Sequence, residues 1–177
     1  MKNKNKTIWS NRFKNKISPT FQKIGSSIHI DKRLYKQDIA ASIVHVQMLM
    51  KQKIIKNEDG NKIINGLKKI KVKIEKGNFE FKEKFEDIHL NIEKALFEII
   101  GPSAGFLHTA RSRNDQVVTD FKLWIKESSK ETLKDISLVM KNLIKKAEKN
   151  TDTIMTGLTH LKNAQPISFA HYLLSYY

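Results

Sequence analysis

The sequence predicts an all-α protein, and three observations support this fold class. Apolar residues recur at helical spacing in five segments, no segment alternates strictly between apolar and polar residues as a strand would, and the chain has no internal repeat. We expect a small N-terminal helical domain over residues 1–114, which begins with an irregular arm over residues 1–30. The start of a central helical bundle domain, truncated by the end of the chain, should follow over residues 115–177.

The expected arm and the first helix meet near Asp31. Residues 1–30 carry isolated aromatic residues between short polar runs, together with Pro19 and Gly25, so their periodicity is weak. A helix should begin with Asp31 as its N-cap and end near Lys53. Because this helix is largely apolar, most of it should be buried.

Two further helices should complete the N-terminal lobe. One begins at Asn57, next to acidic residues, and ends at Gly77, a residue type that favours a C-terminal cap. The other runs from Ile88 to Ile100 and ends before a Gly-Pro pair. Together the three helices should form one lobe.

The longest predicted helix runs from Asp115 to about Asn150, a segment without Pro or Gly. At about 1.5 Å per residue it measures about 50 Å, which is more than a small lobe can cover, so we expect partner helices elsewhere. A last helix should run from Ile167 to Tyr177 with Pro166 at its N1 position. The chain stops within this apolar run, which indicates a truncation.

The composition indicates a soluble, cytoplasmic protein without a membrane segment or a signal peptide. The absence of Cys excludes disulfides and thiolate metal sites. The formal net charge of +15 raises nucleic acid as a partner, but only four basic residues are Arg and the Lys are scattered along amphipathic segments. We therefore interpret the charge as a solvated surface and expect no specific nucleic-acid partner, while a basic nucleic-acid-binding module stays the competing hypothesis.

The strongest local signal is the polar segment H-T-A-R-S-R-N-D-Q over residues 108–116. Arg111 and Arg113 can each clamp a carboxylate, and Ser112 and Asn114 can donate hydrogen bonds to its oxygens. The N-terminus of the long helix adds positive potential at the same place. The segment therefore predicts an anion-binding loop, and the alternative is a helix cap formed by Asn114 or its neighbour Asp115.

Three other polar segments are weaker signals. Thr159 and His160 precede Pro166, and a His beside a Thr suits proton transfer at neutral pH, although a loop His is more often an ordinary hydrogen-bonding residue. The segment D-I-H-L-N-I-E brings Asp87, His89, Asn91 and Glu93 together, and we favour a surface or supporting network there over a metal site. In G-S-S-I-H-I-D, Ser27 is either a helix cap or a binding residue. We interpret His29, His45 and His171 as structural.

These segments, in this order, resemble argininosuccinate lyases of the fumarase and aspartase superfamily. The resemblance runs from W-S-N-R-F at residues 9–13 through S-I-H-I-D-K-R-L, E-D-I-H-L-N-I-E and H-T-A-R-S-R-N-D-Q to G-L-T-H-L-K-N-A-Q-P. It implies reversible cleavage of argininosuccinate to arginine and fumarate in arginine biosynthesis, without metal or organic cofactor. It also implies a homotetramer in which several subunits contribute to each active site.

The resemblance also implies roles for individual residues. His160 matches the family's acid–base histidine, and Thr159 would hold the substrate beside it. A second acid–base Ser and further binding residues occur later in the family's chain, so we expect this fragment to be inactive alone. The other matching positions are substrate-binding residues, with Asp87 and His89 less settled than the rest: Ser27, Asp87, His89, Arg111, Ser112, Arg113 and Asn114.

Four positions depart from the family's pattern. Ser10 and Asn11 replace two glycines of the N-terminal arm, and Thr156 and Leu158, which replace a Pro and an aromatic residue, stand close to Thr159. They bear on local loop geometry and on no residue assigned to chemistry. Two alternatives share the fold: a non-catalytic structural relative, as in lens crystallin, and a sister lyase that acts on adenylosuccinate.

Overall fold

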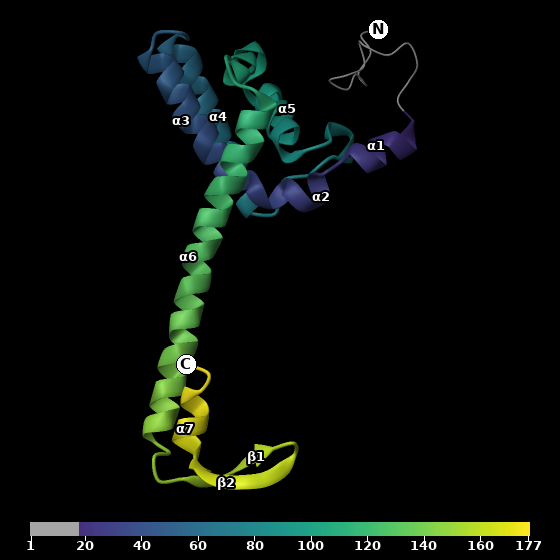
Figure 1. Cartoon of the computed structure of the whole chain (residues 1–177). Coiled ribbons are helices and arrows are strands. Elements are labelled where there is room, and N and C mark those ends of the chain that lie inside the picture. Colours follow the sequence, from purple (N-terminus) through teal and green to yellow (C-terminus); the bar gives the residue numbers. More distant parts are fainter. Residues whose placement is uncertain (1–17) are drawn as a thin grey trace. The chain divides into compact units, whose positions relative to one another are not determined.

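The computed structural model describes residues 18–177, and the chain forms two compact units, Met1–Trp124 and Ile125–Tyr177. The chain is mostly helical, with one two-stranded antiparallel sheet (Figure 1). The all-α class is confirmed in its main feature, whereas the hairpin was not predicted. The division at residues 114 and 115 stays a prediction. The elements are α1 (Pro19–Gly25), α2 (Ile28–Asp31), α3 (Tyr35–Lys51), α4 (Asn57–Glu75), α5 (Ile88–Ile100), α6 (Arg113–Glu148), β1 (Ile154–Thr159), β2 (Lys162–Ser168) and α7 (Phe169–Leu174).

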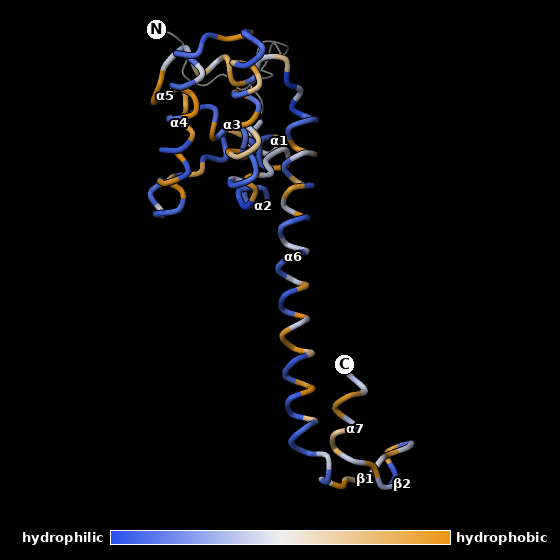
Figure 2. Tube along the Cα trace, turned by 90° about the vertical axis from the view of Figure 1, so that its left-hand side faces the viewer, coloured by the Kyte–Doolittle hydropathy of each residue, from blue (hydrophilic) through white to orange (hydrophobic). Residues whose placement is uncertain are grey.

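The first unit is built on α3, α4 and α5, which pack on one another through their apolar faces (Figure 1). Figure 2 shows the hydrophobic positions recurring along these helices between hydrophilic ones, as the helical periodicity predicts. Several core side chains are fully buried and come from all three helices: Ile39, Val46, Leu49, Ile63, Leu67, Ile70, Ile88, Ile92 and Leu96.

The predicted helix bounds hold within a few residues for α3, α4, α5 and α6. Gly77 has a φ of +71°, which is the left-handed conformation expected just past a helix end. The prediction of an irregular arm is wrong over residues 19–30, because Ser18 caps α1 with its Oγ accepting from the Phe21 N–H at 3.2 Å and Pro19 lies at the first turn. The segment that contains Ser10 and Asn11 lies outside the described residues.

The second unit contains the hairpin and α7, which packs through Ala170 and Leu173 onto Ala147 of α6. Pro166 lies in β2 rather than at a helix N-terminus, so the last helix begins later than predicted. Ser168 is its N-cap, with Oγ accepting from the His171 N–H at 3.1 Å.

The long helix α6 exposes many large apolar side chains, as expected for a helix that needs partners. Among the described residues, no helix combines the length and the apolar character needed to cross a membrane. The exposed fractions of the large apolar side chains of α6 range from 38% to 63%: Val117, Val118, Phe121, Ile125, Leu133, Ile136, Leu138 and Val139.

Candidate functional site

The predicted anion-binding loop leads directly into α6, and Ser112 caps that helix. Ser112 Oγ accepts from the Asn114 N–H at 3.2 Å, and the Ser112 carbonyl accepts from the Gln116 N–H at 3.1 Å. The alternative caps, Asn114 and Asp115, lie inside the first turn instead. The side chain of Asn114 is exposed there, next to the N–H groups of the helix N-terminus, where an anion would be favoured.

Arg113 is held by side chains near the N-termini of α5 and α6, and these two helix N-termini form one corner of the first unit. It donates to Gln116 Oε1 at 2.7 Å and forms ion pairs with Glu93 at 3.0 Å and Asp87 at 3.6 Å. Asp87 in turn caps α5, with its Oδ1 accepting from the Leu90 N–H at 2.6 Å. In this arrangement Arg113 fixes the start of α6 to the start of α5.

Arg111 fastens the loop to α3. Its Nη1 donates to Ser42 Oγ at 2.9 Å, and the Nε2 of His45 lies 2.9 Å from the Thr109 carbonyl. His45 therefore has the structural role predicted for it. The loop is thus attached to α3 on one side and to α5 on the other.

Ser27 lies beside the same corner, immediately before α2. Its backbone N–H donates to the Glu86 carbonyl at 2.9 Å, next to Asp87, and its Oγ donates to Asp31 Oδ2 at 2.6 Å. The other Asp31 oxygen accepts from the Ile88 N–H at 3.1 Å. The structure therefore brings the predicted residues of the first unit together at the N-termini of α5 and α6.

His89 is buried rather than on the surface. It belongs to a polar cluster with Asp38, Asp120 and Gln116, and this cluster was not predicted from the sequence. His89 is 1% exposed, and its Nδ1 lies 3.0 Å from Asp38 Oδ1 and 3.5 Å from Asp120 Oδ2. Gln116 Nε2 donates to the same Asp38 oxygen at 2.5 Å. Asp38, Asp120 and Gln116 are themselves almost fully buried, so α3, α5 and α6 share one buried polar cluster.

Burial and neighbouring charges shift the pKa values of Asp38, His89 and Asp120. Burial would raise the pKa of Asp38, but the hydrogen bond and charge of His89 outweigh it and lower that pKa. Burial would lower the pKa of His89, and Asp38 raises it instead. Burial and the neighbouring Asp38 together raise the pKa of Asp120 to about 8.

The same cluster holds the one group of His and carboxylate side chains, among the described residues, that has the spacing of a metal site. One ligand atom from each of Asp38, His89 and Asp120 lies within 4.8 Å of the others. Two oxygens and one nitrogen suit a divalent cation. However, Asp38 Oδ1 already accepts two hydrogen bonds, which leaves that oxygen little capacity for an ion.

Thr159 and His160 belong to the hairpin of the second unit. Thr159 pairs with Lys162, so His160 and Leu161 are the two turn residues, with φ values of +49° and +61°. Two-residue turns with both φ values positive normally use Asn or Gly. His160 therefore stands exposed at a turn with an unusual backbone, and such outliers cluster at functional sites.

The two departures beside this turn lie within paired strands. Thr156 pairs with Pro166 and Leu158 with Asn163 across the hairpin, so neither substitution opens it. Gly157 between them is needed, because a Cβ there would lie 2.9 Å from the Gln165 carbonyl oxygen.

The left-handed backbone at Leu161 gives a testable prediction. Leu161 is 96% exposed and adds no packing, so Leu161→Gly should remove the strain and stabilise the hairpin by about 0.5–1 kcal/mol. Amide hydrogen exchange of β1 and β2 would measure this gain. Leu158→Gly, at an exposed position within β1, is the control and should weaken the hairpin; faster exchange in Leu161→Gly would contradict the prediction.

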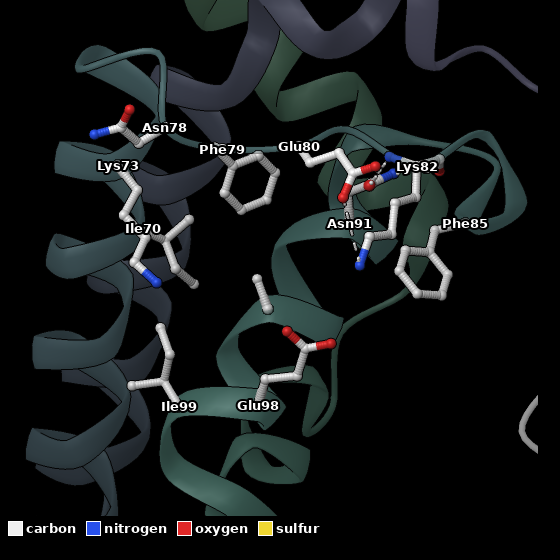
Figure 3. Close-up of a pocket in the computed structure, with 11 residues that line it drawn as sticks. Ile70, Lys73, Asn78, Phe79, Glu80, Lys82, Phe85, Asn91, Glu98 and Ile99 are labelled. Atoms are coloured by element: carbon white, nitrogen blue, oxygen red, sulfur yellow. Dashed lines mark hydrogen bonds and ion pairs between the residues drawn. The ribbon is translucent and has the colours of Figure 1, made fainter.

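A pocket of about 300 Å³ lies between the end of α4, the segment that follows it, and α5 (Figure 3). Phe79 and Ile70 face Ile99 across it, and Lys82 and Glu98 line the other side. Of its lining residues, Asn91 alone belongs to a polar segment that the sequence indicated, and its side chain is hydrogen-bonded to backbone groups of Lys82 and Asp87. Two separate candidate sites follow: the corner at the N-termini of α5 and α6 in the first unit, and the hairpin turn in the second unit.

Comparison with known proteins identifies the family. A family model described as Lyase matches residues 11–177. The chain belongs to this lyase family. The match covers every described residue, and it confirms the resemblance to the lyases that the ordered motifs indicated.

Two curated relatives match almost the whole length of this lyase-family chain. It is 57% identical over 177 residues to a protein named argininosuccinate lyase from Pelagibacter ubique, which covers 99% of this chain and 38% of the relative. It is 47% identical over 169 residues to a protein of the same name from Bartonella bacilliformis, covering 96% of this chain and 36% of the relative. The chain thus spans little more than a third of the length of these curated relatives.

A solved structure also matches this lyase-family chain. It is a variant of EDDS lyase with bound fumarate, 26% identical, with a TM-score of 0.69 over 92% of this chain and 32% of that one. The helical arrangement of the described residues is therefore one found in lyases.

Proposed function

We propose that this chain is the N-terminal part of an argininosuccinate lyase, which eliminates fumarate from argininosuccinate and releases arginine. The observation that carries the proposal is the identity of 57% over 177 residues to a relative of that name. The fumarate in the EDDS lyase structure supports the same product class. We further propose a cytoplasmic homotetramer, because the resemblance implies active sites built from several subunits.

In the proposed reaction His160 transfers a proton, and Thr159 holds the substrate beside it. Removing the proton next to a carboxylate gives that carboxylate a second negative charge, so the reaction requires hydrogen-bond donors already in position. We propose the side chain of Asn114 and the N-terminus of α6 as these donors, and Ser27 joins them when its hydroxyl turns from Asp31 to the substrate. Their placement at the corner of the first unit supports this assignment.

Arg111 and Arg113 have a different proposed part. Since their guanidinium groups bind Ser42, Gln116 and Glu93, we propose that they hold the loop in place and add positive potential. His89 and Asp87 support the same corner from α5. The second proton, needed by the departing nitrogen, would come from a group outside these 177 residues.

A chimera tests the proposal. This chain would replace the matching N-terminal segment of the Pelagibacter ubique protein, whose remaining residues would complete the site. We expect the chimera to cleave argininosuccinate and to leave adenylosuccinate intact, whereas the 177-residue chain alone should do neither. A folded chimera without turnover, compared with an active parent protein, would contradict the proposal.

A further inference from the structure

We propose that Asp120 carries a proton at neutral pH and shares it with Asp38, which makes the buried Asp120–Asp38–His89 cluster a proton-binding site that positions the start of α6. This site lies beneath the anion-binding corner rather than in it. The proposal needs only the described contacts, and it holds whether or not the protein is a lyase.

The hydrogen bonds made by the carboxyl groups of Asp120 and Asp38 indicate which of the two is protonated. In the part of the chain that the structure describes, neither side-chain oxygen of Asp120 accepts a hydrogen bond, although both are fully buried. Asp38 accepts from His89 and from Gln116, so it is satisfied as an ionised carboxylate. A carboxyl oxygen of Asp120 lies within 4.8 Å of one of Asp38, and two carboxyl groups this close in a buried place can avoid like-charge repulsion, and bond to one another, only if one is protonated. The proton belongs on Asp120, because the nearby His89 Nδ1 lies 3.5 Å from Asp120 Oδ2 but only 3.0 Å from Asp38, to which it is hydrogen-bonded.

The net charge of the buried cluster also favours a neutral Asp120. With Asp120 neutral, Asp38 ionised and His89 protonated, the cluster has no net charge, as a buried cluster requires. The other charged groups that act on it are Arg111 on Asp120, and Arg113, Asp87 and Asp31 on His89. These two Arg are already bound to other side chains, so they do not replace the proton.

The protonated cluster joins three helices, α3, α5 and α6. Asp38 comes from α3, His89 from α5, and Asp120 and Gln116 from the first two turns of α6. Arg113 and Asn114 lie within the turn that precedes Gln116, at the corner proposed to bind a carboxylate. Asp120 is thus a positioning residue: its proton fixes the α6 start against both neighbouring helices. A divalent cation in the same place is the competing occupant.

The direct test is infrared spectroscopy of the 177-residue chain with isotope-labelled Asp. We expect a carbonyl band of a protonated carboxylic acid at pH about 7, which disappears as the pH rises through about 8. The band should be missing in Asp120→Asn and present in Asp115→Asn, which changes an exposed Asp of the same helix. No such band in the unsubstituted chain, or the same band in Asp120→Asn, would overturn the proposal. The wild-type titration alone decides the matter if a variant fails to fold.

The pH dependence of unfolding provides a second, independent readout. A folded-state pKa of about 8 against an ordinary 3.8 means that the folded chain binds one more proton between these values, so stability falls as pH rises through this window. The window between pH about 5 and 6 lies below the ordinary pKa of His89 and below its raised folded pKa, so His89 adds little slope there, and it is present in both chains that are compared. There the unfolding constant should rise about tenfold more per pH unit in the unsubstituted chain than in Asp120→Asn. Equal slopes would contradict the proposal.

Metal analysis separates the two occupants. The proposal predicts no stoichiometric divalent cation in the purified chain and no change in its stability when Zn²⁺, Mn²⁺ or Mg²⁺ is added and then chelated. A bound cation that is lost in Asp120→Asn and kept in Asp115→Asn would replace the proton-binding site with a metal site.

Discussion

His160→Asn in the chimera should lower kcat by about a hundredfold to ten-thousandfold, the usual contribution of a general acid or base. The fold should be unaffected, because His160 is an exposed turn residue and the substitution keeps its backbone. Asn also tolerates the positive φ of this turn better than most residues. Steady-state kinetics with argininosuccinate would measure the loss.

Leu161→Asn is the matched control for this substitution, because it places the same residue type at the neighbouring turn position. It should retain most of the turnover. If the His160 variant keeps normal kcat, the histidine does not transfer the proton; if both variants lose activity equally, the turn rather than the imidazole is responsible.

Asp38→Ala should destabilise the first unit by about 3–5 kcal/mol, the range found when one partner of a buried ion pair is removed. Asp38 is 1% exposed and accepts hydrogen bonds from His89 and Gln116, which would both lose their partner. Denaturant unfolding of the 177-residue chain would measure the change. The contact between α3 and α6, which the hydrogen bond from Gln116 to Asp38 provides, should be lost in this variant.

Asp115→Ala is the control for this second substitution. Asp115 is exposed in the first turn of α6, so its removal should change stability by no more than about 0.5 kcal/mol. A loss below about 1 kcal/mol for Asp38→Ala would mean that the buried cluster is not a principal stabilising contact.

Local sequence signals were sufficient for most helices. The 3.6-residue periodicity between Ile88 and Ile100, and the uninterrupted run that forms α6, are properties of neighbouring residues, so they could be recognised in the sequence. The hairpin could not be recognised, because its pairing depends on contacts across the turn. Its turn residues, His160 and Leu161, are not the types that signal positive φ.

The predicted site residues of the first unit were recognisable because they occur together in polar segments. The buried cluster escaped prediction because Asp38, His89 and Asp120 are far apart in sequence and meet only after α3, α5 and α6 have packed. One signal was available: Asp38 is a lone acidic residue within a largely apolar helix, and such a residue requires a buried partner. The identity of that partner depended on the tertiary fold.

The measurement that most directly tests whether this chain forms part of an argininosuccinate lyase site is the product balance of the chimera. Arginine and fumarate would be quantified by NMR while argininosuccinate is consumed. We expect one arginine and one fumarate for each argininosuccinate lost, and the reverse reaction when both products are supplied. A folded, correctly assembled chimera that leaves argininosuccinate unchanged, while the parent protein cleaves it, would contradict the proposed function.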